Sequence, residues 1–326
     1  MSRTCFLTGA LGCIGAWVVK HILDRGEDPV IYDLDDDLRR IRDLVTPEQL
    51  ERVCLVQGDV TDTDAVAAAL RESGADRIIH LAGLQVPTCR ANPVLGARVN
   101  VVGTLNLFQA AAECKIPRLV YASSAAVYGP DDLGPNGAAP DETTPCNPTT
   151  HYGVYKRANE GNAQVFFADS GVSSVGIRPL TVYGVGRDQG MTSDPTRAMK
   201  AAVLSRPFQI RFSGATDYQY VSDCAMTFLE CTDRAPEGAH VFNLHGDSVD
   251  MAEVIDLIHE NSPEGAPAIT VEGPTLPIPP SMDGNRIEAA IPDLPKTSLS
   301  QGVRMTMEHF ARLRDEDRLD TRDLDE

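Results

Sequence analysis

Short apolar segments alternate with longer amphipathic ones through the first half of the chain. The apolar segments are rich in β-branched residues, as buried strands are, and the amphipathic segments repeat apolar positions at helical spacing. Strands are predicted at residues 4–9, 29–33, 53–59, 77–83, 118–124 and 173–179, and helices at 14–25, 38–45, 62–74, 99–114 and from 151 onward. Because alternating strands and helices form right-handed βαβ units, the pattern predicts an α/β fold with a doubly wound parallel sheet.

The pattern changes after Pro179, where Gly and Pro become frequent and the predicted helices are shorter. Residues 260–285 form a loop-rich insert with one short strand predicted at 268–273. We therefore expect a sheet domain at 1–179, with returning segments from the C-terminal half, and a smaller lobe at 180–312 that closes over the ligand-binding edge of the sheet. Residues 313–326 are an acidic tail, interpreted as a polar helix end or a disordered terminus.

Composition narrows the classes of partner. Of the 326 residues, 42% are hydrophobic and 23% charged, as in ordinary globular proteins, and the net charge is −18. Such an acidic surface repels nucleic acid and anionic membranes, so neither is expected as a partner, although local arginines can still hold a small anion. No apolar run of about 18 residues suggests a membrane span, and the N-terminal segment is interpreted as a first strand and not a signal peptide.

The eight cysteines are scattered, with no Cys-x-x-Cys pair and no histidines at metal-ligand spacing. Reduced, mostly buried thiols in a cytoplasmic protein are therefore expected, and no metal site.

A glycine-rich segment follows the first predicted strand directly. Gly9, Gly12 and Gly15 permit a tight turn, close approach of the backbone to a pyrophosphate and close packing of helix on strand. Asp33 ends the second strand, where a carboxylate binds ribose hydroxyls and repels a 2′-phosphate, so NAD is predicted over NADP. Asp59 and Val60, at the end of the third strand, either hold the adenine or form only a turn.

The segment HYGVYKRANEG at 151–161 contains two tyrosines near one lysine. Residues four apart share a helix face, so Tyr152 and Lys156 lie together, whereas Tyr155 points elsewhere. An ammonium beside a phenol lowers the pKa of the tyrosine from about 10, as a hydroxyl-directed general base requires. On spacing alone this pair is either a base or part of an exposed helix face.

Five ordered motifs together resemble the extended short-chain dehydrogenases/reductases, and within them the NAD-dependent epimerase/dehydratase family typified by UDP-galactose 4-epimerase. They are the glycine triplet 9–15, HLAG at 80–83, NVVGT at 100–104, YASSAAVYG at 121–129 and NPTTHYGVYK at 147–156. The resemblance covers nearly the whole chain, most strongly to about Gly186, and implies a Rossmann-type NAD-binding domain.

The resemblance also implies roles for individual residues. Tyr152 exchanges a proton with a substrate hydroxyl, Lys156 binds the nicotinamide ribose and depresses the tyrosine pKa, and Ser124 holds the reacting oxygen; Ser123, His151 and Tyr155 are expected to be structural. The cofactor contacts implied are Gly9, Gly12, Cys13, Ile14, Gly15, Asp33, Asp59, Val60, Leu81, Ala82, Gly83, Asn100, Tyr152 and Lys156. Substrate contacts are expected at Ser124, Thr181 and Arg187.

Two departures from the family pattern narrow the chemistry. Ala125 and Ala126 follow Ser124 where the family's dehydratases carry Asp-Glu and its decarboxylases a glutamate, so neither elimination nor decarboxylation is expected. Thr216 stands where nucleotide-sugar epimerases usually place a diphosphate-binding arginine, and near the end of the C-terminal lobe only Arg286 is close to the second such position. The alternative candidates are Arg187, Arg197 and Arg211, each of which is otherwise a solvated surface residue.

Three functions follow from this pattern. The leading hypothesis is an NAD-dependent dehydrogenase that oxidises a secondary hydroxyl of a sugar, sugar acid or similar polyhydroxylated substrate. The alternative is a nucleotide-sugar (UDP-hexose) 4-epimerase that works through a transient 4-keto intermediate. A third is an NAD-sensing protein without redox activity, which any turnover would exclude. The apolar helices at 100–114 and after Tyr152 resemble those that form a four-helix bundle in this family, so a homodimer is expected.

Overall fold

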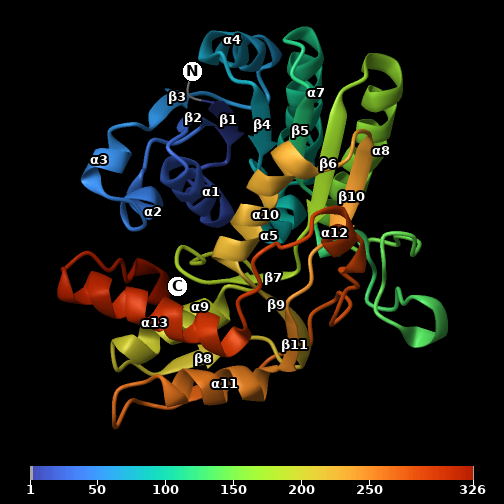
Figure 1. Cartoon of the computed structure of the whole chain (residues 1–326). Coiled ribbons are helices and arrows are strands. Elements are labelled where there is room, and N and C mark those ends of the chain that lie inside the picture. The colour runs from blue at the N-terminus through green and yellow to red at the C-terminus, as the bar shows by residue number, and fades with distance from the viewer. Residues whose placement is uncertain (1–2, 326) are drawn as a thin grey trace.

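A seven-stranded parallel sheet forms the centre of the computed structural model, which describes residues 3–325 (Figure 1). Its order is β10-β6-β5-β4-β1-β2-β3, and neighbouring strands all pair in parallel. The strands are β1 (Thr4–Thr8), β2 (Asp28–Asp33), β3 (Cys54–Gln57), β4 (Arg77–His80), β5 (Arg118–Ala122), β6 (Ser173–Arg178) and β10 (Ala239–Asn243). The predicted Rossmann-type sheet is confirmed, and its edge strand β10 comes from the C-terminal half.

Helices cover both faces of this sheet and divide its side chains between two cores. α1 (Cys13–Asp24) and α10 (Val221–Arg234) lie on one face; α4 (Thr63–Ser73), α7 (Gly103–Glu113) and α8 (His151–Ser170) lie on the other. Successive strand residues point to opposite faces, so Leu7 packs in the first core and Phe6 in the second. Burial on both faces explains why the strands are continuous apolar runs.

Helix boundaries follow local capping signals. α8 begins where the Thr150 hydroxyl accepts a hydrogen bond from Gly153 N at 3.0 Å, and it ends at Gly171, whose φ of 70° suits glycine. The helices predicted at 38–45 and 99–114 differ in extent from those observed. The first region holds α2 (Arg39–Arg42) and α3 (Pro47–Leu50); the second follows α5 (Val86–Ala91) and is continuous through α6 (Pro93–Ala97) and a π-helical turn (Arg98–Val102) into α7.

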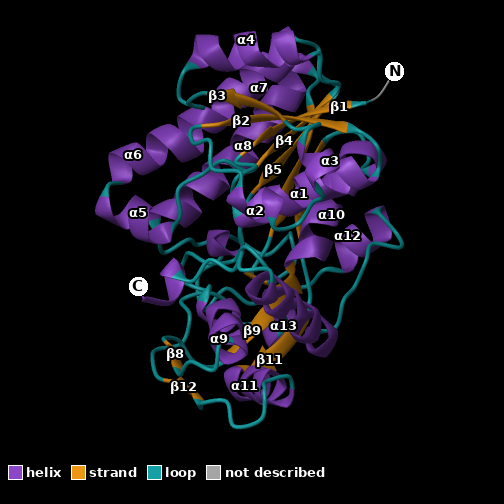
Figure 2. Cartoon of the chain, turned by 90° about the vertical axis from the view of Figure 1, so that its left-hand side faces the viewer, coloured by secondary structure: helices purple, strands orange, loops and turns teal. Residues whose placement is uncertain are grey.

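The C-terminal lobe lies beyond the carboxyl ends of the main strands (Figure 2). It has a three-stranded sheet of β7 (Thr181–Tyr183), β9 (Ala215–Tyr220) and β11 (Asp247–Asp250), and a pair formed by β8 (Phe208–Ile210) and β12 (Ile269–Val271). Its helices are α9 (Asp194–Val203), α11 (Met251–Glu260) and α13 (Leu299–Asp315), whereas α12 (Asn285–Ala290) packs beside β10 of the main sheet (Figure 1). Short 3-10 turns occur at Ala125–Val127, Pro135–Gly137 and Arg322–Asp325. β12 confirms the strand predicted at 268–273.

Residues 313–325 of the acidic tail pack against the rest of the fold, which supports the polar helix end over a disordered terminus for these residues. α13 ends at Asp315, and the following residues return to the junction between the lobes, where both views place the C-terminus (Figures 1 and 2). Asp323 accepts a 2.7 Å hydrogen bond from Lys200 Nζ on α9, and Asp320 pairs with Arg39 on α2 at 2.8 Å. The sequence suggested solvation because it shows the charges but not their distant partners.

Within residues 3–325, none of the helices has the length and apolar character needed to cross a membrane. The same residues hold no group of three or more His, Cys, Asp or Glu side chains arranged for a metal ion. The eight cysteines are free thiols.

Candidate active site

The glycine-rich turn lies where β1 and β4 end side by side, at the point where the strand order reverses direction. Gly9 has a φ of 69°, and a Cβ there would lie 2.4 Å from Ala82 N. A Cβ on Gly15 would lie 2.3 Å from Gly9 O. Side chains at these two positions would therefore push the turn away from β4 and α1. The turn leaves the N-terminus of α1 open toward the space above the sheet, where a pyrophosphate is bound in such folds.

Two carboxylates end the neighbouring strands, as predicted. Asp33 closes β2 and accepts hydrogen bonds from Leu11 N at 3.2 Å and Leu34 N at 2.9 Å. Burial raises the pKa of Asp33, and these backbone donors partly oppose the rise. Asp59 accepts a 2.8 Å hydrogen bond from Thr61 N within a turn after β3. Val60, which was also predicted to contact adenine, is buried. The proposed contact with adenine stays a prediction.

Ser124, Tyr152 and Lys156 converge beyond the end of β5. Ser124 lies just after the strand in extended conformation, and its hydroxyl shares a hydrogen bond with Tyr152. The Lys156 ammonium lies 5.4 Å from the centre of the Tyr152 ring and donates a 2.7 Å hydrogen bond to Ala122 O. Tyr155 points elsewhere, donating to Pro93 O at 2.8 Å. The structure thus brings the three predicted catalytic residues together.

Lys156 by itself does not lower the pKa of Tyr152 as the spacing led us to expect. Burial raises the pKa of Tyr152; the hydrogen bond with Ser124, and then the charge of Arg187, oppose that rise without cancelling it. Burial also lowers the pKa of Lys156 to about 8, so its ammonium is itself destabilised. Desolvation therefore outweighs charge attraction here, and a phenolate at Tyr152 requires additional positive charge in the cavity.

A cavity of about 340 Å³ joins the glycine-rich turn to the catalytic residues. Of the predicted cofactor and substrate residues, it is lined by Gly9, Gly12, Cys13, Ile14, Gly15, Leu81, Gly83, Ser124, Tyr152, Lys156 and Arg187. Thr181 was expected to contact substrate, but it is fully buried and its hydroxyl is bonded to that of Thr216 at 2.9 Å. Because β7 pairs with β9, the side chain of Thr181 packs within the lobe, and its contact with substrate stays a prediction.

The three candidate arginines for an anionic substrate group differ in their partners. Arg211 is tied to Asp194 by bonds of 2.7 and 2.9 Å, and Arg197 is buried and donates to the same carboxylate at 3.3 Å. Arg187 donates to the Thr192 hydroxyl at 2.9 Å, and no carboxylate of residues 3–325 forms an ion pair with it. Arg187 is therefore the candidate whose charge is free to meet a ligand.

A buried polar chain supports the floor of the cavity. His80 lies between the hydroxyls of Thr8 at 2.6 Å and Thr104 at 3.0 Å, and burial lowers its pKa to about 3. Asn100 donates to Gly96 O at 3.0 Å, while its Oδ1 lacks a hydrogen-bond partner among the residues described and lies 2.7 Å from the position of a Cβ on Gly83. A buried orphan acceptor beside the cavity is typical of a site that is completed by a ligand.

Among the cavity-lining residues that sequence reasoning did not single out are Arg40, Gln85 and Asp188. Arg40 follows β2 and Asp188 lies in the C-terminal lobe, where they meet through an ion pair at 2.6 Å. A partner 148 residues away leaves no mark in the local pattern. The sequence offered one indication for Asp188, because it directly follows Arg187, a predicted substrate contact.

Three features of the cavity and its surroundings fit a bound dinucleotide. The turn at Gly12 presents bare backbone at the N-terminus of α1, Asp33 ends β2 as a ribose ligand would, and the orphan oxygen of Asn100 lies near Lys156 at the other end. These residues would hold the two halves of NAD on either side of the pyrophosphate.

The chain is similar to known epimerases over most of its length. The model of the NAD dependent epimerase/dehydratase family matches residues 5–244. A UDP-glucose 4-epimerase of Azospirillum brasilense is 30% identical over 291 residues, which cover 82% of this chain and 80% of that protein. A UDP-glucose 4-epimerase of Mycolicibacterium smegmatis is 28% identical, with coverage of 93% and 97%.

Solved structures agree with this similarity. The UDP-glucose 4-epimerase of Thermus thermophilus in complex with NAD has a TM-score of 0.80 at 25% identity, covering 94% of this chain and 99% of that one. MoeE5 in complex with UDP-glucose and NAD has a TM-score of 0.78 at 25% identity, covering 95% and 99%. These relatives support the 4-epimerase alternative better than the dehydrogenase hypothesis. The fold, the cavity and the similarity agree that this chain is an enzyme of the NAD-dependent epimerase/dehydratase family.

Proposed function

We propose that the protein is an NAD-dependent nucleotide-sugar 4-epimerase that works through a transient 4-keto sugar. The observation that carries the proposal is the convergence of Ser124, Tyr152 and Lys156 on a cavity shared with the glycine-rich turn. The named relatives support the choice of a UDP-hexose as substrate. Ala125 and Ala126 supply no second acid or base, so the site is suited to oxidation and reduction at one carbon.

In this mechanism NAD, when bound, accepts and returns the hydrogen of the reacting carbon. Tyr152 Oη takes the proton of the sugar hydroxyl and later returns it to the same oxygen. Inversion requires the keto sugar to turn within the cavity, so that the hydrogen would return to the opposite face of its carbon. Ser124 Oγ fixes that oxygen. Lys156 Nζ, held by Ala122 O, contributes positive charge that favours the phenolate and lies where it can bind a ribose. Burial raises the pKa of Tyr152, and the positive charge that bound NAD would supply would act in the opposite direction.

A specific observation favours the dehydrogenase as second candidate. Two of the candidate arginines, Arg197 and Arg211, are bound to Asp194, and the buried Thr216 offers no charge where a diphosphate would bind. A diphosphate bound without free arginine forks loses charge-assisted contacts of about 1.5–3 kcal/mol each. A small polyhydroxylated acid would need only Arg187.

The two candidates are separated by product analysis of the purified protein. It would be incubated with NAD and either UDP-galactose, UDP-glucose, free sugars or sugar acids, with NADH absorbance and sugar products followed together. Interconversion of the UDP-hexoses without NADH accumulation supports the epimerase. Stoichiometric NADH with a free sugar or acid, and no interconversion, replaces it with the dehydrogenase.

We also propose a cytoplasmic homodimer. Support comes from exposed apolar side chains that gather on α6, the following π-helical turn and α8. They are Val94, Leu95, Val102, Val154 and Val165, exposed by 41–67%. A second copy would cover this face by helix packing. Light scattering should give twice the mass of 35.2 kDa, and Val154→Asp combined with Val165→Asp should give the monomer. A monomeric native protein would contradict the dimer.

A further inference from the structure

A single guanidinium bridges the glycine-rich turn and the C-terminal lobe. Arg40 Nη1 donates to Leu11 O at 2.7 Å, within the turn between Gly9 and Gly12. Its other edge donates to the two oxygens of Asp188, from Nε at 3.1 Å and from Nη2 at 2.6 Å. This fork geometry uses both sides of the guanidinium and is the strongest form of arginine–carboxylate contact.

Asp188 is nearly buried and is shared by two arginines. Its side chain is 9% exposed, and it also accepts from Arg39 Nη2 at 3.3 Å. Burial alone would raise the pKa of Asp188, but the hydrogen bond and charge of Arg40 hold it below the usual value. The carboxylate is therefore charged at neutral pH, and opening the pair would leave a poorly solvated charge on each side.

The acidic tail extends the same bridge. Arg39 Nη1 pairs with Asp320 at 2.8 Å, and the tail is held to α9 because Lys200 Nζ donates to Asp320 O at 3.0 Å. Asp188 and Asp320 are thus two carboxylates of the C-terminal half facing two adjacent arginines of the sheet domain. We call Arg39, Arg40, Asp188 and Asp320 the clasp.

The clasp lies beside the groove for the dinucleotide. Arg40 and Asp188 line the same cavity as Gly12 and Cys13, which begin α1 and face the expected pyrophosphate. Their ion pair therefore crosses the cavity wall where the two parts of the molecule meet. Opening this wall would widen the cavity beside the turn on which a dinucleotide would be seated.

We propose that the clasp retains NAD in the enzyme, with Arg40 and Asp188 as positioning residues that set the rate of cofactor release. The inference rests on the NAD-dependent function proposed above. It explains why Arg40 is paired with the nearly buried Asp188, since an unpaired arginine at this place would attract any anion. Retention suits an epimerase, which uses the same cofactor molecule in every cycle, whereas a dehydrogenase must exchange it.

The test measures release of NAD and not turnover. Wild type and Asp188→Asn would be loaded with radiolabelled NAD and chased with excess unlabelled NAD at several salt concentrations. Loss of the charged fork should accelerate release by on the order of tenfold or more. Salt should accelerate release from wild type and have a smaller effect on the variant, because the screened ion pair is already gone.

Asp233→Asn is the matched control, because Asp233 pairs with three arginines at the opposite edge of the same sheet. It should lower the melting temperature without changing NAD release. If Asp188→Asn does not fold, Arg40→Lys keeps the charge but loses the fork and should also accelerate release. Asp320→Asn removes the ion pairs of Asp320 with Arg39 and Arg322 but leaves the Arg40–Asp188 fork in place, so it should give a smaller acceleration.

Release from Asp188→Asn that is unchanged or slower than from wild type would overturn the clasp. The same result would follow if Asp233→Asn accelerated release equally, since the effect would then be general destabilisation. Failure of the proposed function is distinguishable: fast release with no UDP-hexose interconversion refutes the epimerase and keeps the clasp, whereas interconversion with unchanged release does the reverse.

Discussion

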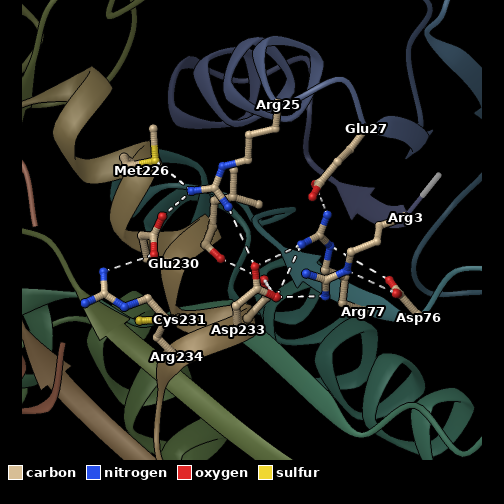
Figure 3. Close-up of polar contacts among 12 residues, drawn as sticks. Arg3, Arg25, Glu27, Asp76, Arg77, Met226, Glu230, Cys231, Asp233 and Arg234 are labelled. Carbon is tan, nitrogen blue, oxygen red and sulfur yellow. Dashed lines mark hydrogen bonds and ion pairs between the residues drawn. The ribbon is translucent and has the colours of Figure 1, made fainter.

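The amino and carboxyl ends of the central strands differ in whether their arginine and lysine side chains have carboxylate partners. At the amino edge, Arg3, Arg25, Arg77 and Arg234 face Glu27, Asp76, Glu230 and Asp233, so that each charge has an opposite neighbour (Figure 3). At the carboxyl edge, Lys156 is buried and Arg187 lines the cavity, and neither has a carboxylate partner within residues 3–325. The first arrangement stabilises the fold, while the second leaves groups ready for a ligand.

The network of Figure 3 is centred on Asp233 of α10, which contacts one arginine just before β1, one just after α1 and one at the start of β4. Arg77 is 2% exposed and also pairs with Glu27. Arg77 connects elements that are distant in sequence. It lies at the amino end of β4, whereas the cavity lies at the carboxyl ends of the strands. Substitutions at the two edges should therefore separate stability from function.

The largest expected effect is on turnover. Tyr152→Phe removes the proton-transferring Oη and should lower kcat about 10²–10⁴-fold, while NAD affinity changes little. Tyr155→Phe is the matched control on the same helix, because its hydroxyl only meets Pro93 O. Steady-state kinetics and NAD titration check both. Full activity in Tyr152→Phe would show that another residue is the base.

At the amino edge, Arg77→Met should lower the free energy of unfolding by about 3 kcal/mol, because it leaves Glu27 and Asp233 without a buried partner. Turnover per folded molecule should stay at the wild-type value. Urea unfolding and active-site titration measure the two quantities. If Arg77→Met had native stability but a low kcat, the separation of stability at the amino edge from function at the carboxyl edge would be wrong.

Lys156→Met should abolish turnover yet stabilise the protein by on the order of 1–3 kcal/mol at pH 7. Burial lowers the folded-state pKa of Lys156 from 10.5 to about 8, so below pH 8 both states are charged and the full penalty applies. Between pH 8 and 10.5 the unfolded state binds more protons, so wild-type stability rises and the advantage of the variant shrinks.

Lys200→Met is the control for this prediction, since Lys200 is equally buried but paired with Asp323. It should destabilise the protein. Thermal unfolding of both variants across this pH range provides the measurement, and a destabilised Lys156→Met at pH 7 would mean that its ammonium is better solvated than the structure indicates.

A smaller effect is expected at Arg187. If its free charge meets an anionic part of the substrate, Arg187→Ala should raise KM about tenfold with kcat little changed. Arg211→Ala, whose guanidinium is occupied by Asp194, should change neither. Equal kinetics for Arg187→Ala and wild type would place Arg187 outside the substrate site.

Local signals predicted much of this site, and long-range contacts account for what they missed. Alternation of strands and helices, the glycines before α1 and the spacing of Tyr152 and Lys156 are short-range features that the fold preserves. The clasp joins Arg40 to a residue 148 positions away, and the burial of Thr181 depends on its pairing with β9, which the local sequence does not show. The raised pKa of Tyr152 depends on burial, which spacing does not report.

The most direct test of the central claim uses UDP-galactose labelled with deuterium at C4. The account predicts that UDP-glucose forms with the label retained at C4 and without net NADH, because the hydrogen leaves and returns while the cofactor stays bound. Loss of the label, or NADH accumulating in proportion to substrate consumed, would contradict a 4-epimerase that retains its NAD.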